Sequence, residues 1–517
     1  MREGEQTRDK VGADETRSAG RGLIYIASAK IFFIITAYAV HLTLPRLLGS
    51  KEAFGLYSTA MSLASILNNV LIASTVQTVS KLVSEDESRA GPTLRQGLGI
   101  QLVVGAALGG VMFLLAPVIS TTLLKDEALT PLLRTTSAVL FAYALYAALV
   151  GSLNGRHIFH KQAGLDVTFS TLRTGGILGG AVLGGSFALG PLGAIGGFAS
   201  AAVAILLVAL VVVGTGQGSS ELPLRRWTSF MAPLLLYQTF LNGILLSDIL
   251  VMKGTIASLG VDAGMTTEAA RELASGHVGV YSAAQKFALV PYQLMLSMTF
   301  IVFPMISRAT SAGDRAAARA TIRAAMRFSV LMLLSVAAPL AGAADGVMRV
   351  AYPDEYLAGA GALGILVFGA AAFALFVITA TVMSGAGRPS IAAIIGGMGL
   401  VAVVTGNRLF VQLVGVEGDV PSAAALGTSL GMAFAMVAGA VVIHRLFGAL
   451  IAPATVVRAA VAGGVAFAVA RFVPHDSAVM AVVALGAGFL VYGAALALTG
   501  ELRRADLEVI FRVLKRR

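Results

Sequence analysis

Ionisable side chains within apolar stretches are the residues of this chain that could do chemistry. Lys30, Arg173, Asp248, Lys286 and Arg408 each lie inside a run of mostly apolar residues. A charged group at the centre of a membrane-spanning helix costs about 2.5–3.5 kcal/mol on insertion scales, so each of them is a functional candidate. Four cations against one acid suit an anionic ligand, because fixed cations stabilise an anion strongly where the dielectric constant is low.

The four cations also have structural interpretations. Lys30 and Lys286 could each pair with a nearby acid or carbonyl group and hold the helices together. Arg173 and Arg408 could extend from a helix end toward the membrane interface, since long side chains place their charge in water while their stems stay in lipid. Both interpretations stay open for all four residues.

Asp248 and His41 are the candidates for ion coupling. Asp248 could bind a coupling proton or ion, or it could pair with Lys253 near the outer end of its helix. His41 lies three helical turns after Lys30 on the same face, and its unperturbed pKa of about 6.5 would let it respond to a proton gradient. A His near the membrane interface could also simply be solvated.

Amide side chains are the candidate contacts for sugar hydroxyl groups. The four candidates are Asn69, Gln238, Asn242 and Gln293. Amides also join membrane helices through hydrogen bonds, so the same residues could serve packing alone. Glycines favour packing more clearly. The span at about 164–188 has overlapping small-xxx-small spacings, which predict close contact with another helix, at Gly175, Gly176, Gly179, Gly180 and Gly184.

The elements that position these residues are predicted to be transmembrane helices. Apolar residues make up 57% of the 517 residues and charged residues only 13%, too few to cover a soluble surface. The mean hydropathy is +0.84. Runs of about 20 apolar residues predict fourteen spans. They lie at about 22–45, 54–80, 97–122, 131–153, 164–188, 191–214, 228–252, 278–305, 328–348, 358–384, 390–414, 422–444, 455–473 and 477–499.

The distribution of Lys and Arg predicts the orientation. With both termini in the cytoplasm, about 26 of the 38 basic residues fall on inside segments and about 8 on outside segments. The net charge of +11 therefore fits membrane orientation, and no basic cluster is interleaved with aromatic residues as in a nucleic-acid site. Cys is absent. The chain has no phosphate-binding loop or zinc-protease motif, and we expect no cofactor, metal site or catalytic residue.

An internal repeat divides the predicted helices. Phe54–Ala60 opens the second span and Val278–Ala284 opens the eighth with a similar sequence, while Gly-Arg pairs end the fourth and tenth spans. Each unit has six helices, an even number, so both units start on the same side of the membrane and have the same orientation. The predicted fold class is therefore all-α, with two parallel-oriented six-helix bundles plus two extra C-terminal helices. The predicted parts are a cytoplasmic tail 1–21, an N-lobe 22–215, a C-lobe 227–445, a helix pair 455–499 and a basic cytoplasmic tail 500–517.

Several of these segments resemble those of the polysaccharide transporters, the Wzx-type O-antigen flippases. This family belongs to a superfamily that also contains MATE exporters and lipid II flippases. The resemblance covers nearly the whole chain, and its most specific segments are Ala29–Phe33, Leu44–Gly49, Phe54–Tyr57, Leu153–Arg156, Ser247–Val251 and Gly279–Lys286. These segments indicate the broad family and not its substrate.

The resemblance implies a flippase that carries isoprenoid-diphosphate-linked oligosaccharide from the inner to the outer leaflet by alternating access. It implies a bacterial inner-membrane protein with a cation-lined cavity between the two bundles, in which Lys30 and Lys286 attract the diphosphate. Helices 13 and 14 would offer a groove for the lipid tail. The implied partners are the lipid-linked oligosaccharide, membrane lipids and proteins of polysaccharide biosynthesis.

Three other functions compete with this one. A lipid II flippase and a cation-coupled drug exporter belong to the same superfamily, and the exporter would need acids facing an apolar cavity. A membrane polymerase or ligase would be an enzyme, and it would need a large outside loop with catalytic groups. The largest predicted outside loop, Gly254–Gly276, is short. We therefore do not expect an enzyme.

Overall fold

The protein is an all-α polytopic membrane protein. Its computed structural model describes residues 25, 28–187, 189–219, 222–474 and 477–502, which form helices and connections without a strand among them. The predicted tail 1–21 and residues 503–517 of the predicted basic tail lie outside the described residues. Helices are the expected elements because lipid offers no hydrogen-bond partner, so each segment must satisfy its own backbone groups.

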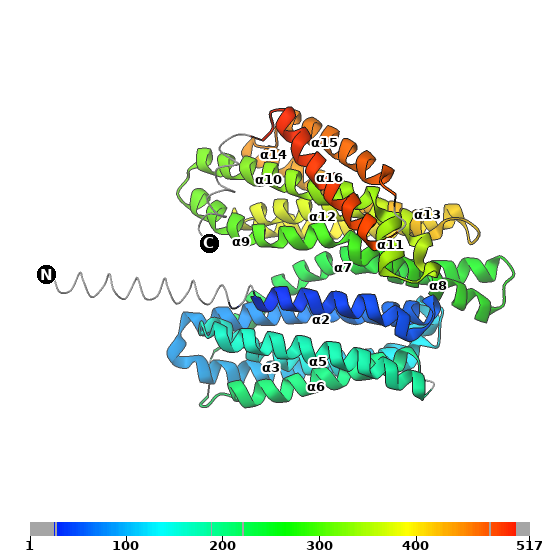
Figure 1. The fold of residues 1–517 in the computed structure, drawn as a ribbon. Coiled ribbons are helices and arrows are strands. Elements are labelled where there is room, and N and C mark those ends of the chain that lie inside the picture. The colour runs from blue at the N-terminus through cyan, green and yellow to red at the C-terminus, as the bar shows by residue number, and fades with distance from the viewer. Residues whose placement is uncertain (1–24, 26–27, 188, 220–221, 475–476, 503–517) are drawn as a thin grey trace. The chain divides into compact units, whose positions relative to one another are not determined.

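The helices follow one another with short connections (Figure 1). The first described helix is Ser28–Leu48. The others are α2 (Lys51–Glu85), α3 (Ala90–Val118), α4 (Leu129–Gly155), α5 (Phe159–Ser186), α6 (Pro191–Val213), α7 (Leu224–Asp262), α8 (Thr267–Ala288), α9 (Val290–Ser311), α10 (Arg315–Gly342), α11 (Ala344–Ala351), α12 (Ala360–Gly385), α13 (Pro389–Val414), α14 (Val420–Phe447), α15 (Pro453–Phe472) and α16 (Ala478–Leu498).

Twelve helices of the described chain are long and apolar enough to cross a membrane. They coincide with twelve of the fourteen predicted spans. The other two predictions correspond to α5 and to the pair α8 and α9, which are also helical. The predicted span 278–305 has the wrong bounds, because its helix begins at Thr267 and breaks at Leu289. Pro291 explains the break, since proline lacks an N–H and its ring clashes with the preceding turn.

The predicted outside loop Gly254–Gly276 is also wrong. Helix α7 continues to Asp262 and α8 begins at Thr267, so only four residues connect them. The Thr266 side chain caps α8 by accepting a hydrogen bond from the backbone N–H of Ala269 at 3.3 Å. Hydropathy alone misses this segment because the first turns of α8 carry charged residues.

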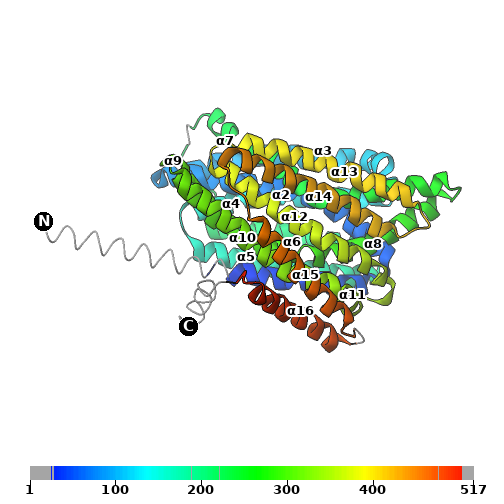
Figure 2. The same ribbon diagram turned by 90° about the horizontal axis from the view of Figure 1, so that it is seen from above.

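The chain divides into two compact units, residues 1–242 and 243–517. In the first unit α4 is central, since it packs against α2, α3 and α6, while α5 packs against α6. In the second unit α12 is central, since it packs against α9, α10 and α14, while α13 packs against α14. The contacts of α4 and α5 in the first unit thus have counterparts in those of α12 and α13 in the second unit. This agrees with the predicted internal repeat. Figure 2 shows α15 and α16 side by side in the second unit, where α15 also contacts α10.

Three of the five glycines in the predicted packing motif form the contact between α5 and α6. A β-carbon at Gly176, Gly180 or Gly184 would meet the backbone of α6. Gly175 and Gly179 have no neighbour within 4 Å of that position. The prediction of close packing is therefore confirmed, and the structure identifies the face with Gly176, Gly180 and Gly184 as the one that makes the contact.

We expect Gly197→Ala to destabilise the first unit. A β-carbon at Gly197, on α6, would overlap the carbonyl oxygen of Gly176 on α5. Overpacking of this kind costs about 1–3 kcal/mol, so the melting temperature of the purified protein should fall. The matched control is Gly196→Ala, because nothing lies within 4 Å of a β-carbon there. Equal melting temperatures for the two variants would contradict the glycine-mediated contact.

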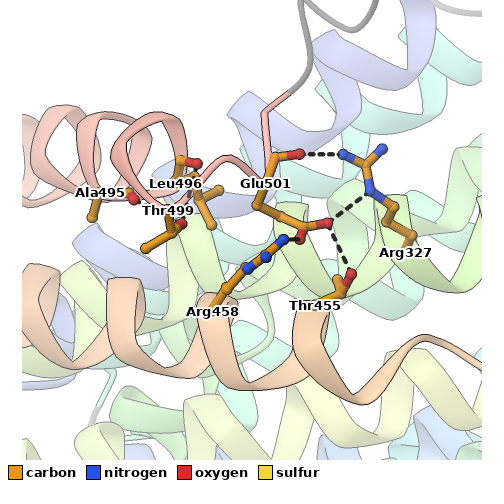
Figure 3. A network of polar contacts seen from close by, with 7 residues as sticks. All are labelled: Arg327, Thr455, Arg458, Ala495, Leu496, Thr499 and Glu501. Carbon is orange, nitrogen blue, oxygen red and sulfur yellow. Dashed lines mark hydrogen bonds and ion pairs between the residues drawn. The ribbon is translucent and has the colours of Figure 1, made fainter.

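Within the second unit, a buried carboxylate joins the end of α16 to α10 and α15 (Figure 3). Glu501 is 5% exposed and follows α16. Its carboxylate accepts hydrogen bonds from Arg327 Nε at 2.9 Å, Thr455 Oγ1 at 2.9 Å and Arg458 Nη1 at 3.2 Å. Arg327 belongs to α10, and Thr455 and Arg458 belong to α15. Burial alone would raise the pKa of Glu501, but these hydrogen bonds outweigh it and lower that pKa below its ordinary value of 4.5.

Glu501→Gln should lower stability at neutral pH and should have little effect in acid. A depressed pKa stabilises the fold above the unfolded-state value, and this stabilisation is lost as the pH falls through the folded-state pKa. The melting temperatures of native and variant protein should therefore differ at pH 7 and converge as the pH falls below 4.5. Glu417→Gln, at an exposed position between α13 and α14, is the control. A difference that persists unchanged in acid would rule out the ionic contribution.

Candidate functional site

In the first unit, Lys30 pairs with an acid that the sequence analysis does not identify. Helix Ser28–Leu48 places Lys30 near its start, and α5 places Asp166 in its second turn. The atoms Lys30 Nζ and Asp166 Oδ2 are 3.6 Å apart. The lysine side chain is 63% exposed and that of Asp166 is 15% exposed. An ion pair with so exposed a partner contributes little stability, and the ammonium group stays accessible to a ligand.

Arg173 extends this surface along α5. It lies seven residues after Asp166, on the same face, and in the middle of the helix rather than at its end. Its guanidinium group lies 4.6 Å from the ring centroid of Phe33. The Phe33 ring in turn lies 6.0 Å from Phe169. Lys30, Asp166, Arg173 and these two rings form what we call the cation–aromatic surface. It carries two positive charges against one negative charge.

Three of the predicted amides of the first unit form one hydrogen-bonded chain. Asn69 Nδ2, on α2, donates to Asn242 Oδ1, on α7, at 3.0 Å. Asn242 Nδ2 donates to the backbone oxygen of Gln238 at 2.9 Å and contacts its side-chain oxygen at 3.4 Å. Asn242 is buried, whereas Asn69 is exposed. This series of hydrogen bonds joins α2 to α7 and leaves Asn69 accessible.

In the second unit, Asp248 is fully buried in a polar network. Its carboxylate accepts hydrogen bonds from Tyr281 Oη at 2.5 Å and from Gln285 Nε2 at 2.9 Å. The backbone N–H of Ile249 donates to the same carboxylate at 2.8 Å. Lys253, the alternative partner, is also buried and donates to the backbone oxygen of Arg271 and to Ser275 Oγ. These contacts favour an interior role for Asp248 over a surface ion pair.

The network of Asp248 continues into α13 and α14. Thr428, on α14, lies within hydrogen-bonding reach of Tyr281. Asn407 Nδ2, on α13, donates to Thr428 Oγ1 at 3.1 Å and to the backbone oxygen of Ala424 at 3.4 Å. The side-chain oxygens of Asn407 and Gln285 are buried without a hydrogen-bond partner in the described chain. Gln285 contacts the carboxylate directly, and an unused acceptor oxygen on such a neighbour can accept a hydrogen bond from a protonated carboxyl group or help to bind a small cation.

The remaining predicted site residues lie elsewhere on the helices. Lys286 follows Gln285 in the last turn of α8, is half-buried and interacts electrostatically with Asp248. Gln293 is half-buried on α9, and Arg408 is exposed on α13. His41 is half-buried on the first described helix, eleven residues after Lys30. The described residues include no cluster of three or more His, Cys, Asp or Glu side chains that could hold a metal ion.

The second unit also contains an apolar groove between α10, α12, α14 and α15. Its volume is about 760 Å³. Small and apolar side chains line most of it, among them Gly364, Phe368, Leu430 and Phe467, with the ion pair Asp345–Arg471 at one end. Such a lining fits a hydrocarbon chain better than a sugar.

Comparison with known families decides the class of this protein. The family model for polysaccharide biosynthesis proteins matches residues 19–310, more than half of the chain. The chain belongs to this family. The match includes the cation–aromatic surface, the amide chain of Asn69 and Asn242, and Asp248 with its partners Tyr281 and Gln285. A comparison with curated proteins gives no match.

Solved structures with the same fold are flippases and exporters. An inward closed conformation of the lipid II flippase MurJ is 14% identical, with a TM-score of 0.73, over 92% of this chain and 98% of that chain. An inward-facing multidrug-resistance MATE transporter is 16% identical, with a TM-score of 0.60, over 80% and 98%. A MOP superfamily transporter from Pyrococcus furiosus is also 16% identical, with a TM-score of 0.57, over 83% and 95%. At these identities the likeness concerns the fold.

The family and the fold together confirm the resemblance seen in the sequence. The chain belongs to the polysaccharide biosynthesis family, has the fold of solved flippases and exporters, and is a multi-pass membrane protein. The solved structures that share its fold are named as a flippase and as transporters. The sequence analysis missed Asp166, Tyr281 and Asn407. Tyr281 and Gln285 lie within the segment Gly279–Lys286, which is one of the segments that carry the resemblance. That resemblance is the one sequence feature that could have identified them as site residues.

Proposed function

We propose that the protein is a flippase that moves isoprenoid-diphosphate-linked oligosaccharide from the inner to the outer leaflet, for the synthesis of cell-surface polysaccharide. The cation–aromatic surface carries this proposal. Its two cations suit a diphosphate, because charge-assisted hydrogen bonds are about twice as strong as neutral ones. Its rings offer flat apolar faces to sugars. The excess positive charge disfavours the drug exporter, which would need acids for its cationic substrates.

Each other part of the substrate has a candidate contact. The exposed Asn69 can hydrogen-bond sugar hydroxyls, and Gln238, Asn242 and Gln293 are further candidates of the same kind. Lys286 and Arg408 are additional cations. The apolar groove of the second unit, which α15 helps to line, suits the isoprenoid tail. Alternating access would follow from rocking of the two units.

Ion coupling is assigned to Asp248 in this proposal. Its buried carboxylate, next to Gln285 with its unused acceptor oxygen, can take up a proton or a monovalent cation. A carboxylate that alternates between charged and neutral states inside a membrane protein biases the conformations that bury it. His41 is the second candidate for this role.

A lipid II flippase is the second candidate function, favoured by the TM-score of 0.73 to MurJ. Its substrate shares the isoprenoid diphosphate and differs in its headgroup, so the two candidates share one mechanism. A polymerase or ligase is disfavoured because only four residues connect α7 to α8, where a catalytic loop would be expected. The proposed location is the bacterial inner membrane with both termini in the cytoplasm.

A panel of fluorescent substrates in proteoliposomes tests the proposal. The panel contains an isoprenoid-diphosphate oligosaccharide, lipid II and an organic cation. We expect the oligosaccharide lipid to reach the opposite leaflet fastest. Preferential movement of lipid II would establish the second candidate, and export of the organic cation alone would refute both. Longer glycans in the product would reveal a polymerase.

A further inference from the structure

A second, separate cavity of about 380 Å³ opens at one end of the second unit. The ends of α9 and α14, the start of α10 and the turn between α12 and α13 surround it. Its lining contains Arg315, Arg319 and Arg388 and a single acid, Asp314. The connections at this end belong to the basic segments that the positive-inside rule places in the cytoplasm.

The arginines of this cavity keep their charge available for a ligand. Arg319 Nε donates to the backbone oxygen of Phe447 at 2.6 Å, which is a neutral partner. Gly448, with φ of +61°, ends α14, and a β-carbon there would lie 3.6 Å from Arg319 Nη2. The side chains of Arg315 and Arg388 make no hydrogen bond or ion pair with the described part of the chain. Asp314 accepts a hydrogen bond from the N–H of Ala317 at 2.9 Å and so caps α10.

Two helices also begin at the cavity. Asp314 and Arg388 are the N-cap residues of α10 and α13, so the positive ends of both helix dipoles point toward it. Membrane orientation alone explains basic residues on this side, but it does not require them to line a hollow. A cavity with three arginines, one acid that caps a helix and two helix N-termini has the character of an anion site.

We propose that this cavity binds the phosphate group of a lipid at the cytoplasmic surface. An arginine guanidinium group can donate two parallel N–H···O hydrogen bonds to one phosphate group. A volume of about 380 Å³ admits a headgroup but not a long oligosaccharide. The phosphate can come from an anionic phospholipid or from the diphosphate of a lipid-linked substrate. The site shares no residue with the cation–aromatic surface, and its existence does not depend on the proposed translocation activity.

Binding measurements on the full-length purified protein in a neutral detergent test this site. The probes are a short-chain isoprenyl diphosphate and short-chain phosphatidylglycerol, with short-chain phosphatidylcholine as the neutral lipid. Because charge-assisted hydrogen bonds are lost, we expect Arg315→Gln/Arg388→Gln to weaken binding of an anionic probe by at least about tenfold. Arg319 is retained in this variant because it also holds the end of α14.

The matched control is Arg445→Gln, which removes the same charge from an exposed position on α14 that does not line the cavity. Its affinity for both probes should stay within about twofold of native, since surface substitutions have small effects. Weaker binding of the diphosphate alone would assign the site to the substrate, and weaker binding of phosphatidylglycerol alone would assign it to membrane lipid. Equal affinities of native and double-variant protein for both probes would overturn the proposal. So would a native protein that binds neither.

Discussion

Asp248→Asn is expected to abolish the dependence of translocation on an ion gradient. The substitution keeps the shape of the side chain and removes the negative charge that the proposal assigns to the coupling proton or cation. We expect translocation driven by an imposed gradient to slow by at least about tenfold, as for loss of one strong charge-assisted interaction. The rate is measured in proteoliposomes with and without an imposed proton or sodium gradient.

Tyr281→Phe is the control for this substitution. It removes one hydrogen bond to the carboxylate, worth about 1.5–3 kcal/mol, and leaves the charge of Asp248 in place. Gradient dependence should therefore persist in this variant. Asp248→Asn also leaves one buried donor of Tyr281 or Gln285 without its acceptor, so its melting temperature must be measured alongside. A folded Asp248→Asn protein that still responds to the gradient would show that the network is structural.

Lys30→Ala should weaken substrate binding strongly while the protein stays folded. Loss of a charge-assisted hydrogen bond to a diphosphate costs about 1.5–3 kcal/mol, which is about ten- to hundredfold in affinity. The ion pair of Lys30 with Asp166 is largely exposed on the lysine side, so its loss should cost at most about 1 kcal/mol of stability. The half-saturating concentration of the fluorescent lipid measures the effect.

Asp166→Asn separates the two roles of Lys30. This variant breaks the same ion pair but leaves the lysine charge free for the substrate. Affinity should therefore stay equal or increase, in contrast to Lys30→Ala. If both variants lose affinity to the same extent, Lys30 acts only as a partner of Asp166, and the cation–aromatic surface does not bind the diphosphate.

Hydropathy predicts most of the membrane helices because a spanning segment must be apolar over its whole length. It fails where a helix is polar. The first turns of α8 carry Glu268, Arg271 and Glu272, so the predicted span begins eleven residues too late. Its break at Leu289 depends on Pro291, whose position is visible in the sequence but whose effect depends on packing. The glycine pattern of α5 predicts close packing because residues four apart lie on one face of a helix, and the structure shows which of two such glycine faces makes the contact.

The candidate site is only partly readable from the sequence. Single charges in apolar runs identify Lys30, Arg173 and Asp248 because their cost in lipid is independent of context. Partners cannot be identified in this way. Asp166 lies near the edge of a predicted span, where a charged side chain can reach water and is therefore no sign of a functional site. Asn407 joins the network of Asp248 only because α13, α14 and α7 meet in the folded second unit.

The most direct test of the central claim is a leaflet-accessibility measurement on the native protein. Liposomes containing the protein receive a fluorescent isoprenoid-diphosphate oligosaccharide, and a membrane-impermeant quencher reports the fraction in the outer leaflet. We expect protein-containing liposomes to exchange the lipid between leaflets and protein-free liposomes to leave it in place. If folded protein at comparable density leaves the inner-leaflet fraction unchanged, the protein does not move this class of lipid and the proposed function is wrong.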